Sequence, residues 1–582
     1  MDVLQMELIS KTKNNPHISI DEIPNEILLH IISLNANMAD DDFFSYEPHY
    51  KALCVTRRTS QVSRRWRNLT LGTPEVWANL IDLEIFKTHT ATDWREEVLR
   101  RSGESLLSVK GFLTLCGRNW NLFGIEIIFS FLDKYWDRIQ HLNIQFSGSE
   151  GTFDNDDWLR IFCRPSPLLR SFDLQVASLN LRGFFITYID PDTVLFSGHA
   201  PSLREFHNGS VVPFTPAPWI YQLRILELNF EKKHTDLTIA RMLSELEGMN
   251  VLEHLLIHMG VHRWRAENPA ERIRIIKLPS LRHINITSPD FKHCALLLGN
   301  IVPQPGCSLF LDVRGSYNDR PNTLFPLYTL VPLIARYSNN YFDFGGIKPR
   351  SIEFRLFNYL FQFAAYVESW SFTPFHISGL DYPDRPNKSR CPNPDFNIEV
   401  MDPSYSPTNF GIKLRLMLLK PIISSIPDPA LGLVTAFKLF ISESYLTDQK
   451  VDLMVFLQLM ESLTSVETLA TTTNSLMELT GIGIANSTLP SLRTLTMVGS
   501  LCKSRNEYIA HPIILEFLQL REDAALPIEV FDVRTIDEDS RGGKISFQCL
   551  EVMSGLKVVW RGAENICEYV CGTGNPDILD FD

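Results

Sequence analysis

The sequence predicts an α/β protein: a short N-terminal segment of three helices, then an irregular solenoid formed by a curved parallel sheet with outer helices. One observation is a recurring frame, Leu-x-x-Leu-x-Leu, along much of the chain. Another is the helical spacing of apolar residues within residues 20–82. The third is length, because 582 residues exceed the usual size of one compact core and suit an extended array of repeats.

The first predicted helix lies within residues 20–34. Pro24 suits position N1, where a missing N–H costs nothing, and acidic residues near it suit the helix macrodipole. Apolar residues then recur at helical spacing and give a broad apolar face. These residues are Ile27, Leu28, Ile31, Ile32 and Leu34.

Two further short helices complete the N-terminal helical segment, residues 20–82. Val62, Trp66 and Leu69 repeat the helical spacing, and Thr73-Pro74 predicts an N-cap followed by an N1 proline. The last helix is expected to carry Val76, Trp77 and Leu80. A segment of about 60 residues is marginal alone, so its surplus apolar surface should contact the rest of the chain or a partner protein.

The repeating frame predicts the solenoid. Its copies start at Ile139, Leu169, Leu203, Leu223, Leu252, Leu281, Leu492 and, more weakly, Ile528. The first six starts are 20 to 34 residues apart, which suits one strand and one returning helix per repeat. The alternating core of the frame is typical of a strand, and residues 237–246 predict a helix between two strands. The frame also occurs by chance in leucine-rich segments, but its spacing and the recurring phrase Pro-Ser-Leu-Arg favour stacked repeats.

The remaining chain is divided by composition. Proline and polar residues dominate one stretch, and acidic residues dominate another near the end. The expected divisions are a flexible lead (1–19), linking helices (90–135, with an amphipathic helix at 94–101), a solenoid (136–575, with a strand at 352–357 and a Pro-rich loop at 382–409) and an acidic tail (576–582).

The frame also predicts a polar surface. Residues between the apolar positions of each strand should point to the concave side of the solenoid. These candidate substrate-binding residues are Glu205, His207, Glu227, Asn229, His254, His258, His283, Asn285 and Thr287. If neighbouring repeats pair, His254 and His283 lie side by side, about 4.8 Å apart between strands. We expect this face to bind a substrate with an affinity that varies near pH 6–7, and an ordinary solvated strand face is the alternative.

Two parts of the sequence resemble known families. Ile-Pro-Asn-Glu-Ile-Leu at 23–28, Val-Ser-Arg-Arg-Trp-Arg at 62–67 and Leu-Gly-Thr-Pro-Glu-Val-Trp at 71–77 are similar to the F-box of proteins from mushroom-forming fungi. The repeats resemble irregular leucine-rich repeats, a common partner of F-boxes. Residues 35–50 depart from a minimal F-box as an acidic insertion.

The resemblance implies a substrate-recognition subunit of a cullin-based ubiquitin ligase, a non-catalytic protein. Its F-box would dock on a Skp-type adaptor, and through it on a cullin, while its repeats bind a protein substrate. The residues that would form the adaptor-binding surface and its core are Ile23, Pro24, Ile27, Leu28, Ile31, Val62, Trp66 and Leu69. The alternatives are a leucine-rich-repeat scaffold outside any ubiquitin ligase, and an enzyme whose turnover survives deletion of residues 1–90.

Composition and motifs limit other functions. A net charge of −13 argues against general nucleic-acid binding. Cys567 and Cys571 form the only close pair among ten cysteines, without zinc spacing, so we expect free thiols and no metal site. We also expect no cofactor and no catalytic residue. No nucleotide-binding or hydrolase motif is found. Residues 122–132, the most apolar run, are too short for a bilayer and no signal peptide is evident, so a protein of the cytoplasm, the nucleus or both is expected.

Overall fold

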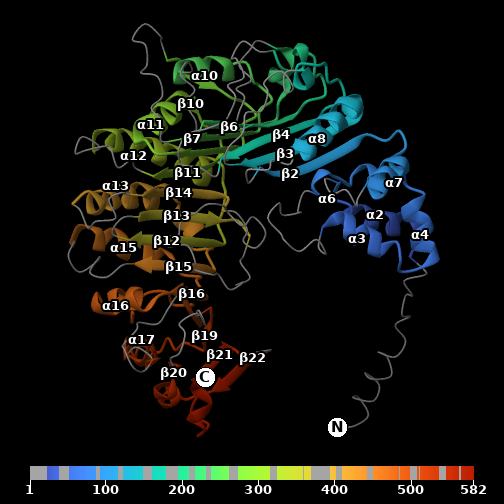
Figure 1. Ribbon diagram of the computed structural model, residues 1–582. Helices are drawn as coiled ribbons and strands as arrows, with labels where there is room; N and C mark the ends of the chain where they lie inside the picture. The colour runs from blue at the N-terminus through green and yellow to red at the C-terminus, as the bar shows by residue number, and fades with distance from the viewer. Residues whose placement is uncertain are drawn as a thin grey trace. The chain divides into compact units, whose positions relative to one another are not determined.

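The computed structural model forms two compact units, residues 1–223 and 224–582, each an α/β unit with a mostly parallel sheet (Figure 1). The structure describes residues 23–38, 51–86, 92–115, 122–148, 160–178, 194–208, 217–230, 238–260, 273–314, 324–357, 360–368, 394–401, 409–441, 450–483, 485–498, 508–509, 512–535, 545–562 and 565–581. None of the helices in these ranges has the length and hydropathy needed to cross a bilayer.

The N-terminal helical segment contains more short helices than the sequence predicts. They are α2 (Asn25–Asn35), α3 (Ala52–Thr59), α4 (Arg64–Leu71) and α5 (Pro74–Ala78), and α6 (Leu83–Phe86) follows directly after the segment. Pro24 is the N-cap of α2 and not N1, whereas Pro74 is the first residue of α5, as predicted. Val62 lies outside any helix because the Ser63 side chain caps α4, accepting a hydrogen bond from the Trp66 backbone N–H at 3.2 Å.

The sheet of the first unit begins earlier than predicted. Its strands are β1 (Ile81–Asp82), β2 (Leu107–Leu115), β3 (Ile139–Gly148), β4 (Ser171–Ser178) and β5 (Glu205–Asn208). They pair in this order, all parallel. The region 90–135 therefore contains a strand between its two helices, α7 (Thr92–Ser102) and α8 (Leu122–Tyr135). The predicted linking helices are correct, but β2 was missed because its sequence lacks the repeat frame.

Aromatic rings fill the core of the first unit, where the last connections are short 3₁₀ helices. Trp136 packs on Phe162 with ring centroids 5.7 Å apart, and Phe196 packs on Trp219 at 5.4 Å. Phe172 lies among them, 5.4 Å from Phe162 and 5.3 Å from Phe196. These contacts place large apolar side chains from several separate segments in one core.

The sheet of the second unit has more strands than that of the first unit, and one antiparallel strand, β13, interrupts its parallel order. In spatial order its strands are β6 (Ile225–Phe230), β7 (His254–Met259), β9 (His283–Ser288), β11 (Ser308–Arg314), β14 (Phe396–Met401), β13 (Leu360–Tyr366), β12 (Ser351–Phe357), β15 (Ala436–Ile441), β16 (Thr468–Thr471), β17 (Thr494–Val498), β19 (Val530–Thr535), β21 (Lys557–Arg561) and β22 (Ile566–Val570). Only β13 and β22 run antiparallel to their neighbours.

Helices alternate with these strands and lie along one side of the sheet of the second unit (Figure 1). They are α10 (Ile239–Leu246), α11 (Phe291–Asn300), α12 (Leu324–Asn339), α13 (Asn409–Ser425), α14 (Asp428–Leu431), α15 (Lys450–Ser462), α16 (Thr473–Gly481) and α17 (Pro512–Asp523). Two small sheets, β8 (Ile276–Lys277) with β10 (Ile301–Val302), and β18 (Tyr508–Ile509) with β20 (Ile545–Ser546) and β23 (Asp580–Phe581), lie apart from the main strands.

Every copy of the repeat frame coincides with a strand. At Leu252 and Leu281 the first apolar residue is buried just before its strand, and the next residues alternate between buried and half-buried. In β17 and β19 the polar positions Thr496 and Asp532 are buried as well. The predicted strand at 352–357 is β12, and the predicted helix within 237–246 is α10. The alternation predicted from the frame is therefore confirmed, and the fold is α/β with parallel strands.

Two predicted irregular segments are wrong in part. The Pro-rich loop at 382–409 contains β14, because Phe396, Ile398 and Val400 alternate with polar residues and fill a place between β11 and β13. The acidic tail at 576–582 is not a solvated end, since Leu579 is buried and β23 pairs with β20. Residues 1–19 and 382–393 lie outside the described residues.

Candidate protein-binding surfaces

The structure separates the predicted adaptor-binding residues into exposed and buried groups. Leu28 and Trp66 are buried and form the small core of the helical segment. Ile23, Ile31 and Leu69 are half-buried. The exposed members are Pro24, Ile27 and Val62.

Large apolar side chains therefore form an exposed stripe on α2, which we define as Ile27, Ile31 and Leu34. Ile27 is 53% exposed and Leu34 is 63% exposed, while Ile31 between them is half-buried. Val62, from the turn before α4, is 60% exposed. Arg65 of α4 holds the start of α2, since its guanidinium donates to the Ile23 carbonyl and to Asn25 Oδ1.

Another part of the apolar surface of the helical segment, around Trp77, is covered by the chain itself. Trp77 of α5 packs edge-on against Trp94 of α7 with centroids 6.1 Å apart, and the Arg101 guanidinium lies 4.6 Å from the Trp77 ring. The Trp77 indole N–H donates to the Thr70 carbonyl at 2.7 Å. The surplus that the sequence indicated thus divides into a covered part around Trp77 and an exposed stripe on α2.

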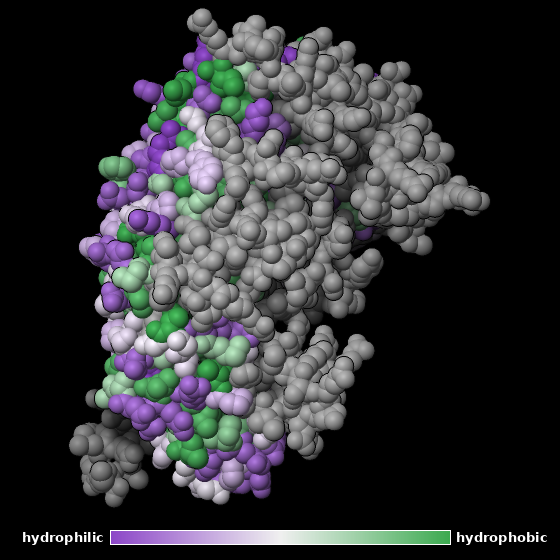
Figure 2. Space-filling view, turned by 90° about the vertical axis from the view of Figure 1, so that its left-hand side faces the viewer, coloured by the Kyte–Doolittle hydropathy of each residue, from purple (hydrophilic) through white to green (hydrophobic). Residues whose placement is uncertain are grey.

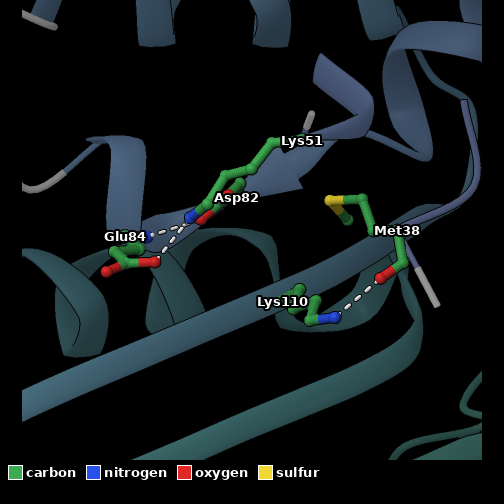
Figure 3. Close-up of polar contacts among 5 residues, drawn as sticks. All are labelled: Met38, Lys51, Asp82, Glu84 and Lys110. Carbon is green, nitrogen blue, oxygen red and sulfur yellow. Dashed lines mark hydrogen bonds and ion pairs between the residues drawn. The ribbon is translucent and has the colours of Figure 1, made fainter. Parts of the chain in front are cut away.

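Two buried lysines tie the helical segment to the first strands of the sheet (Figure 3). Lys51 Nζ lies 3.3 Å from Asp82 Oδ2 and 2.5 Å from Glu84 Oε2. Lys110 of β2, the register partner of Asp82, donates from Nζ to the Met38 carbonyl at 2.7 Å. Burial alone would lower the pKa of Lys51, but the two carboxylates outweigh it and raise that pKa above its usual value.

These contacts fix both ends of the predicted acidic insertion, residues 35–50. Met38 precedes and Lys51 follows the part of it that lies outside the described residues, 39–50. Both ends are anchored at one place, beside the pair formed by β1 and β2. The insertion therefore enters and leaves the fold at neighbouring points.

In the first unit, the predicted residues Glu205 and His207 lie on one face of the sheet. Glu205 is in register with Ser171 of β4, which pairs with His141 of β3, and His207 is in register with Asp173. All of these side chains are half-buried. Burial lowers the pKa of His141, although the carboxylate of Glu205 acts in the opposite direction.

The second unit places the other predicted residues on a common polar face, which we define by the half-buried residues of its strands. Glu227, Asn229, His254, His258, His283, Asn285 and Thr287 all alternate with buried apolar residues. His254 and His283 are register partners with ring centroids 5.9 Å apart, as the frame predicted. His258 Nε2 lies 3.4 Å from Glu227 Oε1, and His283 Nδ1 lies 2.6 Å from Ser308 Oγ.

His283 corrects the expected titration near pH 6–7. Burial lowers its pKa to about 4, and the neighbouring His254 contributes further by charge repulsion. His283 is therefore neutral near pH 7 and has a fixed partner in Ser308. A pH response of this face cannot come from His283 in that range.

Acid–arginine pairs on the same face were missed from the sequence. On β11, β12 and β19 a buried acid lies two residues before an arginine, so both side chains point to one face. The distances are 2.9 Å from Arg314 Nη2 to Asp312 Oδ2, 2.6 Å from Arg355 Nε to Glu353 Oε1 and 2.7 Å from Arg534 Nη2 to Asp532 Oδ2. The alternation Leu309-Phe-Leu311-Asp-Val313-Arg could have revealed the first pair, but prolines around it hid the strand.

Glu399 of β14 is the exception on this face. Among the described residues no ion pair or hydrogen bond involves its carboxylate, and burial raises its pKa to about 7, with a further contribution from Asp312. Arg314 and Arg355 lower that pKa but do not outweigh the burial. This carboxylate is therefore the uncompensated acid of the polar face.

The helix-bearing side of the second unit shows no comparable apolar stripe among the described residues that are visible in Figure 2. Hydrophilic and hydrophobic residues are intermixed there, without one continuous apolar area (Figure 2). Isolated exposed apolar residues of this kind are normal on soluble surfaces.

The described residues also contain no arrangement suited to a metal ion. No group of three or more His, Cys, Asp or Glu side chains converges in the described ranges. The described cysteines are free thiols. Burial raises the pKa of Cys571, the second member of the close pair with Cys567, to about 11.

Comparison with models of protein families and with curated protein sequences finds no match to this chain.

Proposed function

We propose that this protein recruits substrates to a cullin-based ubiquitin ligase and has no catalytic residues of its own. In this proposal residues 20–82 are an F-box that docks on a Skp-type adaptor, and through it on a cullin. The parallel strands and their helices are irregular leucine-rich repeats that capture a protein substrate. The protein would act in the cytoplasm, the nucleus or both.

The observation that carries the proposal is the exposed stripe of Ile27, Ile31 and Leu34, together with the exposed Val62, within the segment that resembles an F-box. Covering a large aliphatic side chain is worth about 1.5–3 kcal/mol, so an exposed set of this size favours a protein partner. The core of this segment is formed by other side chains such as Leu28 and Trp66, whereas Ile27, Leu34 and Val62 are exposed. The same segment is tied to the sheet by Lys51 and Lys110, which suits a docking end that must carry a substrate-binding end.

The test is co-purification of the full chain with a Skp-type adaptor. The double variant Ile27→Ser, Val62→Ser should abolish binding and leave the circular dichroism spectrum unchanged. A matched control is Phe344→Ser, since Phe344 is an exposed apolar residue of the second unit. Adaptor binding that survives the double variant would contradict the proposal.

The polar faces are the proposed substrate-binding surfaces. The residues concerned are Glu205, His207, Glu227, Asn229, His254, His258, His283 and Asn285. The full chain with Glu227→Lys, His254→Ala and His283→Ala should capture less substrate protein than the native chain does, while adaptor binding persists. If capture is unchanged, these residues form an ordinary solvated strand face.

A further inference from the structure

Strand β22 is an open edge of the sheet of the second unit. Among the described residues it pairs only with β21, antiparallel, with Trp560 opposite Cys567 and Val559 opposite Glu568. The Cys571 N–H donates to the Leu556 carbonyl at 2.8 Å, and the Gly562 N–H donates to the Asn565 carbonyl at 2.8 Å. An open edge leaves one row of backbone groups without a strand partner.

The pairing pattern shows which backbone groups form that row. Hydrogen-bonded and non-hydrogen-bonded pairs alternate in an antiparallel ladder. Because residues 565 and 571 bond to β21, residues 567 and 569 do so as well. The N–H and C=O groups of Ile566, Glu568 and Val570 therefore point away from β21, toward the open edge, where the Val570 C=O accepts a hydrogen bond from the Thr573 hydroxyl at 2.9 Å.

The side chains of these same residues are exposed. Ile566 is 62% exposed and Val570 is 44% exposed, and Glu568 lies between them. Glu568 Oε2 is 2.5 Å from Lys557 Nζ on β21, on the inner side of the strand. Natural edges are usually protected by proline, a bulge or several charges, whereas this one carries an apolar–acidic–apolar row and no proline.

We propose that β22 binds an extended segment of a partner protein as an added antiparallel strand. The segment presents a basic residue opposite Glu568, with apolar residues two positions before and after it, opposite Ile566 and Val570. Outward backbone groups supply the hydrogen bonds, and the cross-strand side-chain pairs supply selectivity. The proposal is independent of the proposed ubiquitin-ligase function.

A second copy of this chain fits the edge poorly. Symmetric antiparallel pairing of two β22 strands, with Ile566 opposite Val570, places Glu568 opposite its own copy. Like charges directly opposite are destabilising in a sheet. The acidic residue therefore disfavours self-pairing and favours a partner with a basic residue at this position.

The experiment uses the full chain and a fluorescent peptide with Val-Thr-Lys-Thr-Val at its centre. Anisotropy gives the affinity, and hydrogen–deuterium exchange locates binding by protection of residues 565–571. A peptide with Glu in place of Lys should bind about fivefold more weakly. N-methylation of the lysine amide should abolish binding, whereas N-methylation of a threonine amide, which points away from β22, should not.

Charge exchange on the protein provides the matched variants. Glu568→Lys should reverse the preference between the two peptides. Glu529→Lys is the control, because Glu529 is also an exposed acid with an ion pair, 3.4 Å from Arg493, and should leave the preference unchanged. Absence of protection at 565–571, or an unchanged preference in Glu568→Lys, would overturn the proposal. Concentration-dependent protection of 565–571 without peptide would also overturn it, by showing a second copy at the edge.

Discussion

Glu399 lies directly opposite Asp312, because β14 pairs in parallel with β11 and these two residues share one register position. Asp312 is neutralised by Arg314, whose Nη2 lies 2.9 Å away. Glu399 has no such partner among the described residues, and burial together with Asp312 raises its pKa to about 7. Two carboxyl groups thus lie side by side, but Arg314 forms an ion pair with only one of them, Asp312. The negative charge of Asp312 and burial therefore disfavour ionisation of Glu399.

The first prediction concerns stability and pH. A carboxyl group whose pKa is raised from 4.5 to about 7 on folding contributes stability that is complete below pH 4.5 and is lost as pH rises through 7. In the native protein, this group should lower the free energy of unfolding by about 3 kcal/mol as pH rises from 4.5 to 7. Glu399→Gln has no such group, so this decrease should be absent from the variant. Urea unfolding across this range measures it.

The control for Glu399→Gln is a neighbouring acid with partners. Glu353→Gln removes a buried carboxylate that pairs with Arg355, so it should destabilise the protein well above pH 7. If Glu399→Gln is also destabilising there, Glu399 is compensated and the assignment is wrong.

The second prediction concerns His283. Burial and His254 lower its pKa from 6.5 to about 4, so the folded state resists its protonation. This contribution is present above pH 6.5 and is lost as pH falls through 4, by up to about 3 kcal/mol. His283→Gln should flatten the acid limb of stability, whereas the exposed His199 should have no such effect on replacement by Gln. Equal acid limbs in both variants and the native protein would contradict this.

The histidine pair could be predicted from sequence, but the acid pair could not. The frame places His254 and His283 one repeat apart, so their register follows from spacing alone. Asp312 and Glu399 meet only because β14 returns beside β11 after the chain has formed β12 and β13. No local pattern encodes that return, and the alternation of β14 is short and lies among prolines.

In the helical segment, too, one feature could be predicted from the sequence and another could not. Helical periodicity identified apolar residues such as Leu28 and Ile27, but it did not show which face the chain covers. Trp77 is covered because α7 packs on α5, and β1 and α6 separate these two helices in the sequence. The exposed fraction of Ile27 is thus a property of the assembled unit.

The third prediction concerns the buried ion pairs of Lys51. Lys51→Met removes a buried cation that pairs with both Asp82 and Glu84 and should destabilise the helical segment by about 3 kcal/mol. Tryptophan fluorescence during urea unfolding measures this, since Trp66 and Trp77 lie in the segment. Adding Asp82→Asn should restore part of the loss.

An exposed ion pair is the control for Lys51. Arg100 pairs with Glu97 at 2.7 Å on the surface of α7, and Arg100→Met should leave stability nearly unchanged. Equal losses in the Lys51 and Arg100 variants would show that burial does not decide the strength of these pairs.

The last prediction concerns Arg521 of α17, a buried guanidinium held by backbone carbonyls. Its Nη1 donates to the Thr488 and Ala485 carbonyls, its Nη2 to Leu489 at 2.9 Å and its Nε to Leu526 at 3.2 Å. Among the described residues no carboxylate pairs with it. Burial lowers its pKa to about 10, so it stays charged at neutral pH.

Arg521 is therefore expected to fix the backbone around Leu489, which has a left-handed φ of 52°. Arg521→Met removes the guanidinium hydrogen bonds to these four carbonyls, of which that of Leu489 keeps the Leu492 N–H as a donor, and should cost about 3–5 kcal/mol. The stability of Arg521→Lys should lie between that of the native protein and that of Arg521→Met. An ammonium group has fewer donors than a guanidinium and no planar fork to span these carbonyls. Hydrogen–deuterium exchange of residues 485–498 provides the local measurement. If exchange there is unchanged in Arg521→Met while the protein as a whole is destabilised, the guanidinium stabilises α17 and not this loop.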